Sequence, residues 1–196
     1  MTIPGGSRQS RVVANDHLRA GRISRSEVTT PRDCLAAFQQ EFDYLCRTLR
    51  RLGAPSADVE DLVHDVFLVL HRRWADYDPS HPLRPWLFGI AFRVSSAHRR
   101  RWAREVPRAL GDLEDRQPHP EQAFAAAQAR AILLEALARV PFERRAVLVM
   151  RELDNVAMRD VASALSIPLF TAYSRLRKAR KELEAAVQHI QQRVPR

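Results

Sequence analysis

Large apolar residues recur at three- and four-residue steps through most of this 196-residue chain. Between residues 30 and 53 the recurring positions are Leu35, Phe38, Phe42, Leu45, Leu49 and Leu52. This period matches the turn of an α-helix, and no stretch shows the apolar and polar alternation of a β-strand. The period therefore predicts an all-α protein built from amphipathic helices.

Turn residues divide the helical pattern into two small domains. Helices are expected at about 30–52, 56–74 and 85–104, and again at about 121–139, 142–153, 158–165 and 169–191. Pro107, Gly111, Pro118 and Pro120, with charged residues between them, are typical of a linker. The expected organisation is a flexible basic arm (1–29), a first helical domain (30–104), a flexible linker (105–122) and a second helical domain (123–196).

The charge of the chain indicates what kind of partner it binds. Its 32 Lys and Arg against 23 Asp and Glu give a formal net charge of +9, which favours nucleic acid through release of counterions. The apolar runs are far shorter than the roughly 20 residues of a membrane-spanning helix, and residues 1–9 lack the apolar core of a secretory signal. A cytoplasmic protein without membrane insertion is expected. Because Cys34 and Cys46 stand alone and no His/Cys cluster has zinc spacing, we expect no disulfide, metal or other cofactor.

Residues 161–172 have the apolar skeleton of a helix-turn-helix, which would be the C-terminal DNA-binding unit. On its second helix one side is expected to be buried and carries Leu169, Ala172, Leu176, Ala179 and Leu183. The other side and its flanks carry Phe170, Thr171, Tyr173, Ser174, Arg175, Arg177, Lys178 and Lys181. These donors and rings suit the major groove of DNA, although a solvated basic helix would carry the same charges.

The helix expected at 56–74 has two distinct faces. Its core side carries Val59, Leu62, Val63, Val66, Phe67, Leu70 and Trp74, and the opposite side gathers Asp61, His64, Asp65 and Leu68 at helical spacing. A leucine among charges suggests a partner surface, with a plain solvated face as the alternative. A catalytic or metal pair of aspartates is disfavoured, because one solvent-facing helix offers no cleft and no third group.

The helix after Pro85 combines a basic stripe with aromatic rings. Its inner face is expected to carry Leu87, Ile90, Ala91 and Val94, and the opposite stripe carries Arg93, Ser96, Arg100 and Arg104, which suit phosphates. Phe88, Phe92 and Trp102 add flat surfaces beside Arg99 and Arg101. Such interleaving suits unstacked single-stranded bases, although some of the rings on this helix must belong to the core.

Three segments in this order resemble the extracytoplasmic-function (ECF) sigma factors of bacterial RNA polymerase: Asp58–Phe67, Pro85–Ala91, and Ser174–Arg180 after the helix-turn-helix. The resemblance implies that Asp61, His64, Asp65 and Leu68 bind the clamp helices of the largest subunit of core polymerase. It implies capture of the minus-ten promoter element by Arg93, Ser96, Arg99, Arg100, Arg101 and Arg104. It further implies reading of the minus-thirty-five element by Thr171, Tyr173, Ser174, Arg175, Arg177 and Lys178. An anti-sigma factor as a partner and the absence of catalysed chemistry are also implied.

The chain departs from the family pattern at five positions. Arg93 stands where members often carry Asn, and Ala97 where they often carry Asp. Ser166 and Phe170 each replace a usual Gly, and Tyr173 replaces a usual basic residue. The promoter is therefore expected to differ from the family's commonest one. The residues leave two other classes open. One is an ordinary helix-turn-helix regulator whose first domain binds a ligand or dimerises. The other is a nucleic-acid-processing enzyme with Asp61 and Asp65 as metal ligands.

Overall fold

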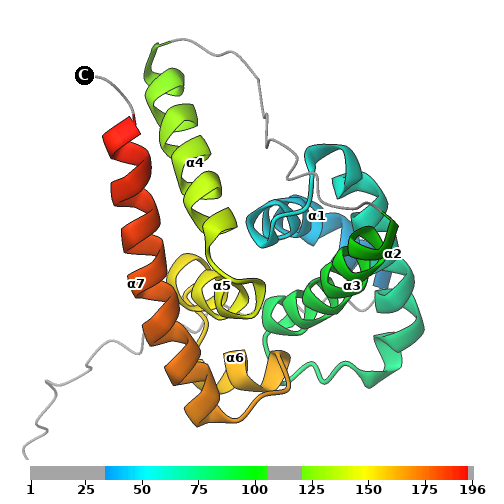
Figure 1. Ribbon diagram of the computed structural model, residues 1–196. Helices are drawn as coiled ribbons and strands as arrows, with labels where there is room; N and C mark the ends of the chain where they lie inside the picture. Colours follow the sequence, from blue (N-terminus) through cyan, green and yellow to red (C-terminus); the bar gives the residue numbers. More distant parts are fainter. Residues whose placement is uncertain (1–33, 106–120, 194–196) are drawn as a thin grey trace, which may run out of the picture.

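The computed structural model describes residues 34–105 and 121–193, and in these two segments all regular structure is helical (Figure 1). The first segment forms α1 (Cys34–Leu52), α2 (Val59–Arg73) and α3 (Leu83–Glu105), with 3₁₀ turns at Ser56–Asp58 and Trp74–Asp76. The second forms α4 (Glu121–Arg139), α5 (Phe142–Leu148), α6 (Met158–Ala164) and α7 (Leu169–Arg193), with a π-helical turn at Val149–Leu153. The predicted all-α class is confirmed. The predicted arm, the expected start of the first helix at about residue 30 and most of the predicted linker lie outside the described residues.

The first domain is a three-helix unit in which α1, α2 and α3 all contact one another. Its fully buried side chains include Leu45, Leu49, Val66, Leu70 and Leu87, each of which contributes roughly 1.5–3 kcal/mol by leaving water. Leu35 and Phe42 belong to the same apolar period but remain 49% and 41% exposed. Phe42 still contacts the core at its edge, because its ring meets that of Phe38 edge to face with centroids 5.9 Å apart.

Gly53 ends α1, as the sequence predicts. Its φ of 91° is in the left-handed region, where a side chain would clash with the backbone. There the amides of Gly53 and Ala54 donate to the carbonyls of Arg50 and Leu49 at 2.9 and 3.0 Å, which satisfies two carbonyls at the helix end. The next helix was expected to begin at about residue 56, but Ser56 opens the 3₁₀ turn instead, and α2 begins three residues later without a side-chain cap.

The second domain is dominated by α4 and α7, which lie side by side in Figure 1. Ala136, Ala186 and Ile190 are buried between them. The helix-turn-helix prediction is confirmed by the burial of Val161, Leu165 and Ala172, which hold α6 against the start of α7. The predicted buried stripe of α7 is wrong at one position. Leu169 is 41% exposed because it is the first residue of α7 and lies at the uncovered end of that stripe.

The two domains share one apolar cluster. Tyr44, Leu52 and Phe88 of the first domain pack in the same cluster as Val147 and its neighbours from α5. At Gly89 the backbones of α3 and α6 meet so closely that an added Cβ would lie 2.6 Å from the carbonyl oxygen of Ala164. The sequence did not predict this contact between domains. Of the described helices, none is long and apolar enough to cross a membrane.

Domain packing corrects the expectation for two aromatic rings of α3. Phe88 is completely buried, and Phe92 stacks on Phe142 of the second domain with centroids 5.0 Å apart and planes 10° from parallel. Both rings were expected to offer flat surfaces for unstacked bases. They pack against the second domain instead, whereas Trp102 remains 45% exposed.

Candidate DNA and polymerase interfaces

The outward face of α7 carries residues predicted to bind DNA. The burial of Ala172, Leu176 and Ala179 fixes which side of the helix faces the protein. The opposite side presents a stripe at steps of four, three and four residues, formed by Phe170, Ser174, Arg177 and Lys181. Arg177, Lys178 and Lys181 are exposed, and none of them forms an ion pair with another described residue. Their charges therefore remain available to a polyanion.

Four of the six predicted minus-thirty-five residues line one hollow between α7 and the start of α5, namely Thr171, Ser174, Arg175 and Lys178. Across this hollow the guanidinium of Arg175 donates to the carboxylate of Glu143 at 3.2 Å. The other two predicted residues, Tyr173 and Arg177, lie on the exposed flank beside the hollow. The structure thus brings four of the six together at one hollow, whereas Tyr173 lies on the opposite flank of α7 from Arg175.

Arg93, the leading candidate for the minus-ten element, is engaged by the other domain. Its guanidinium donates to the carbonyl of Gly89 at 2.8 Å, to the hydroxyl of Ser166 at 2.9 Å and to the carbonyl of Ala164 at 3.3 Å. Partial burial, and secondarily the charge of Arg73, lowers the pKa of Arg93. In this arrangement, therefore, Arg93 holds the turn of the helix-turn-helix.

The remaining basic residues of α3 do not form one continuous stripe. Arg100 donates to the hydroxyl of Ser96 at 2.9 Å, and the Arg99 guanidinium lies 4.7 Å from the centre of the Phe142 ring. Arg101 points toward α2 instead, as described next. Arg104 belongs to α3, but its side chain lies outside the described residues.

The predicted polymerase face of α2 is exposed in the structure. Asp61, His64 and Leu68 are exposed, with Leu68 at 38%. The carboxylate of Asp65 lies 3.8 Å from the guanidinium of Arg101. In the two described segments, no group of three or more His, Cys, Asp or Glu residues could hold a metal ion. This face can therefore offer negative charge and one apolar contact to a protein.

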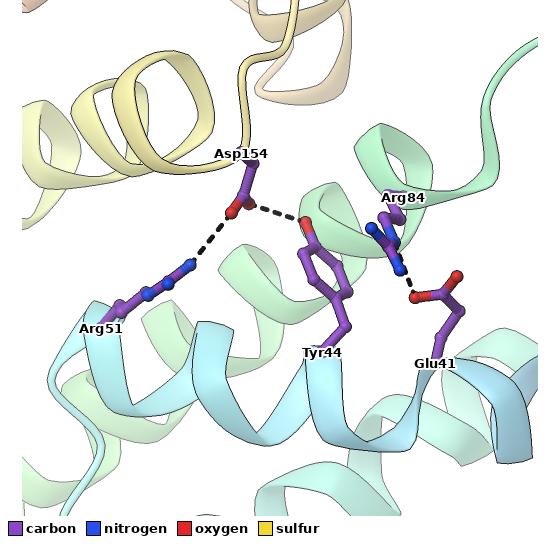
Figure 2. A network of polar contacts seen from close by, with 5 residues as sticks. All are labelled: Glu41, Tyr44, Arg51, Arg84 and Asp154. Carbon is purple, nitrogen blue, oxygen red and sulfur yellow. Dashed lines mark hydrogen bonds and ion pairs between the residues drawn. The ribbon is translucent and has the colours of Figure 1, made fainter. Parts of the chain in front are cut away.

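A polar network that the sequence did not predict joins the domains (Figure 2). The Tyr44 hydroxyl and the Arg51 guanidinium, both from α1, donate to the Asp154 carboxylate at 2.9 and 3.0 Å. Beside them Arg84 donates to Glu41 at 2.9 Å. Burial raises the pKa of Asp154 more than the two donors lower it. Burial also raises the pKa of Tyr44, so its hydroxyl keeps the proton that it donates.

Arg145 of α5 is a buried cation at the same boundary. Only 4% of it is exposed, and burial lowers its pKa to about 10. Its guanidinium donates to the carbonyls of Leu52 at 2.8 Å, Ala138 at 2.7 Å and Val140 at 3.0 Å. These bonds join the end of α1 to the end of α4, where backbone carbonyls lack partners within their own helices.

The sequence does hold a signal for the buried position of Arg145. It lies three residues after Phe142 and four before Val149, so it falls on the apolar side of its helix. A cation at such a position predicts a buried hydrogen-bonding role. Asp154 follows a helix end and carries no comparable signal.

The fold and these surfaces define a two-domain protein of the sigma-70 type. The family described as Sigma-70 region 2 matches residues 37–105, which cover nearly all of α1 to α3. The family described as Sigma-70, region 4 matches residues 130–183, which include the whole helix-turn-helix.

Whole-chain relatives narrow this class. RNA polymerase sigma factor CnrH of Cupriavidus metallidurans is 30% identical over 151 residues, covering 72% of this chain and 79% of the relative. ECF RNA polymerase sigma factor SigE of Mycolicibacterium smegmatis is 29% identical over 149 residues, covering 74% and 58%. The chain belongs to the ECF RNA polymerase sigma factors.

Solved structures share the fold. The sigma factor RpoE in complex with the anti-sigma factor NepR, from Bartonella quintana, superposes with a TM-score of 0.60 at 20% identity and covers 77% of this chain and 96% of that chain. CnrH in complex with the cytosolic domain of CnrY gives 0.56 at 24% identity, covering 79% and 90%.

Proposed function

We propose that this alternative sigma factor binds core RNA polymerase through α2 and recognises a bipartite promoter through α3 and α7. The observation that carries the proposal is the presence, on one chain, of an exposed acidic face on α2 and an exposed basic face on α7. An ordinary helix-turn-helix regulator would account for the second domain only. The factor itself would catalyse no chemistry.

The α2 face would be the polymerase site. Asp61, His64, Asp65 and Leu68 combine charge with an exposed leucine, and clusters of this kind mark protein contacts better than charge alone. Asp61 is the better test position, because Asp65 already lies near Arg101 within the chain.

The two DNA sites would act together. Thr171, Tyr173, Ser174, Arg175, Arg177 and Lys178 would read the upstream element, and Arg93, Ser96, Arg99, Arg100, Arg101 and Arg104 would capture the downstream element. These sites belong to the domains proposed for residues 123–196 and 30–104, joined by a linker over 105–122 and preceded by a basic arm over 1–29. Helices α3 and α4 extend to Glu105 and from Glu121, so each enters that linker by one or two residues.

An anti-sigma factor would be the regulatory partner. The proposal is supported by the two solved relatives, one described as a complex with the anti-sigma factor NepR and the other with the cytosolic domain of CnrY. The partner would cover surfaces that this chain needs for polymerase or DNA, in the cytoplasm where the polymerase works.

The decisive experiment is in-vitro transcription with core polymerase on a random promoter library, paired with a pull-down of Asp61→Arg. The wild-type chain should direct transcription from a defined set of promoters, and Asp61→Arg should lose polymerase association. Glu60→Arg is the matched control, because it makes the same charge reversal on the same helix outside the proposed face. Equal binding of wild type and Asp61→Arg would overturn the assigned interface, and absence of polymerase binding by wild type would favour the regulator.

A further inference from the structure

Phe170 is the most exposed large apolar side chain in the described residues. It is 84% exposed, against 55% for Tyr173, the next most exposed. It belongs to none of the three apolar clusters of the described core. Because the ring contributes little to packing, folding stability does not explain a phenylalanine at this position.

The position of Phe170 relates it to DNA. It is the second residue of α7 and opens the stripe that continues through Ser174, Arg177 and Lys181. In a helix-turn-helix, the N-terminal residues of the second helix are the ones that approach base edges in the major groove. The ring therefore lies where bases are read, with the cations Arg177 and Lys181 about two and three turns further along the same side.

The chemistry of the ring restricts which base it can read. A phenyl group neither donates nor accepts a hydrogen bond, so the donors and acceptors of guanine, cytosine and adenine give it nothing to recognise. Thymine alone presents an apolar group in the major groove, its 5-methyl. Thr171 and Ser174 beside the ring supply hydroxyls for neighbouring phosphates or base edges.

A protein partner fits this surface less well. The hollow next to Phe170 is lined by Glu143, Arg144, Thr171, Ser174, Arg175 and Lys178 together with Pro141. The charges beside this ring are mainly cations, and the exposed Arg177, Lys178 and Lys181 form no ion pair with a described residue. Charge complementarity favours DNA.

We propose that Phe170 determines promoter specificity by packing on the 5-methyl group of a thymine in the upstream promoter element. The proposal rests on the proposed function of α7 as the helix that reads that element.

The test uses the full chain with core polymerase. Promoters are selected from a library randomised upstream, with wild type and with Phe170→Ala. Wild type should enrich thymine at one position, and Phe170→Ala should lose that preference while keeping the others. Deoxyuridine, which lacks only the methyl group, is then placed at that position. Wild-type binding should weaken by about fourfold, the effect of one methylene-sized group, and Phe170→Ala binding should not change.

Phe42→Ala is the matched control, since it truncates another exposed ring (41%) in the other domain; it should keep the thymine preference. If wild type selects promoters but Phe170→Ala selects the same bases, or deoxyuridine is tolerated, the inference fails and the proposed function stands. The same holds if Phe170→Ala loses only binding to an anti-sigma protein. If wild type selects no promoter with core polymerase, the proposed function itself fails.

Discussion

The arginines between the domains and Arg177 on α7 carry the same charge but are held in opposite ways. Arg93 and Arg145 donate to backbone carbonyls across the boundary, and Arg51 pairs with Asp154. Arg177 is exposed and makes no ion pair with a described residue. The first set therefore stabilises the arrangement of the protein, and the second keeps its charge for a partner. The charge of an arginine does not tell whether its role is structural or partner-binding. Burial against the other domain decides between these two roles.

The largest effect is expected from Arg145→Ala, which tests the arginines at the boundary between the domains. The substitution leaves three carbonyls without their donor and opens a cavity, so the free energy of unfolding should fall by about 3 kcal/mol. Thermal or urea unfolding measures it. Arg139→Ala is the control, because its exposed pair with Glu135 should cost at most about 0.5 kcal/mol. Equal losses of unfolding free energy in the two variants would contradict the proposed difference between buried and exposed arginines.

Gly89→Ala should separate the domains without damaging α3. Alanine favours a helix over glycine, but the new Cβ would meet the Ala164 carbonyl at 2.6 Å, and such overpacking costs roughly 1–3 kcal/mol. Small-angle scattering should show a larger radius of gyration. Ala97→Ser adds one atom at an exposed position of the same helix and should leave the radius unchanged. An unchanged radius for Gly89→Ala would show that the domains do not pack this way in solution.

Arg177→Ala tests the exposed cations of α7. Its unfolding free energy should change by less than about 0.5 kcal/mol, whereas promoter binding should weaken by about 1–3 kcal/mol if the residue contacts a base, and Lys178→Ala should behave similarly. Arg180→Ala is the control on the same helix, because Arg180 already pairs with Glu152 at 2.6 Å. A loss spread evenly over all sequences would assign Arg177 to phosphates.

Asp154→Asn should have the smallest effect, with a defined pH dependence. The pKa of Asp154 is raised in the folded protein, chiefly by burial. Its contribution to stability is therefore fully present below the ordinary pKa of 3.8 and declines as pH rises through the folded value. Asparagine keeps an acceptor for Tyr44, so it should match wild type within about 1 kcal/mol and lack this decline. The free energy of unfolding of both proteins, measured from pH 3 to 7, checks the direction of this change. If wild type becomes more stable relative to Asp154→Asn as the pH rises, the prediction is contradicted.

The sequence predicted the helices well because each amphipathic period is a local property. The period places α4 at its observed bounds and the helix-turn-helix at its observed turn. The errors come from contacts between distant segments. Phe88 and Phe92 extend the apolar side of α3 in a direction that only a second domain can cover, and the sequence does not show which helix covers it.

The candidate sites divide in the same way. The outward residues of α7 and the exposed face of α2 follow from burial on their own helices, so their placement was predictable. The engagement of Arg93 by Ser166 was not, since it spans 73 residues. The roles of these residues in binding remain predictions.

The hydrogen bonds of Arg93 also bear on how tightly the factor can hold a promoter. Three of the five N–H donors of the Arg93 guanidinium serve the Gly89, Ala164 and Ser166 oxygens in the packed arrangement, so the full donor set reaches a promoter phosphate only when the domains separate. When only a fraction of molecules is competent to bind, the apparent dissociation constant rises by the inverse of that fraction. Each tenfold preference for the packed arrangement thus weakens the free energy of promoter binding by about 1.4 kcal/mol. A partner that holds the domains apart would restore this binding free energy.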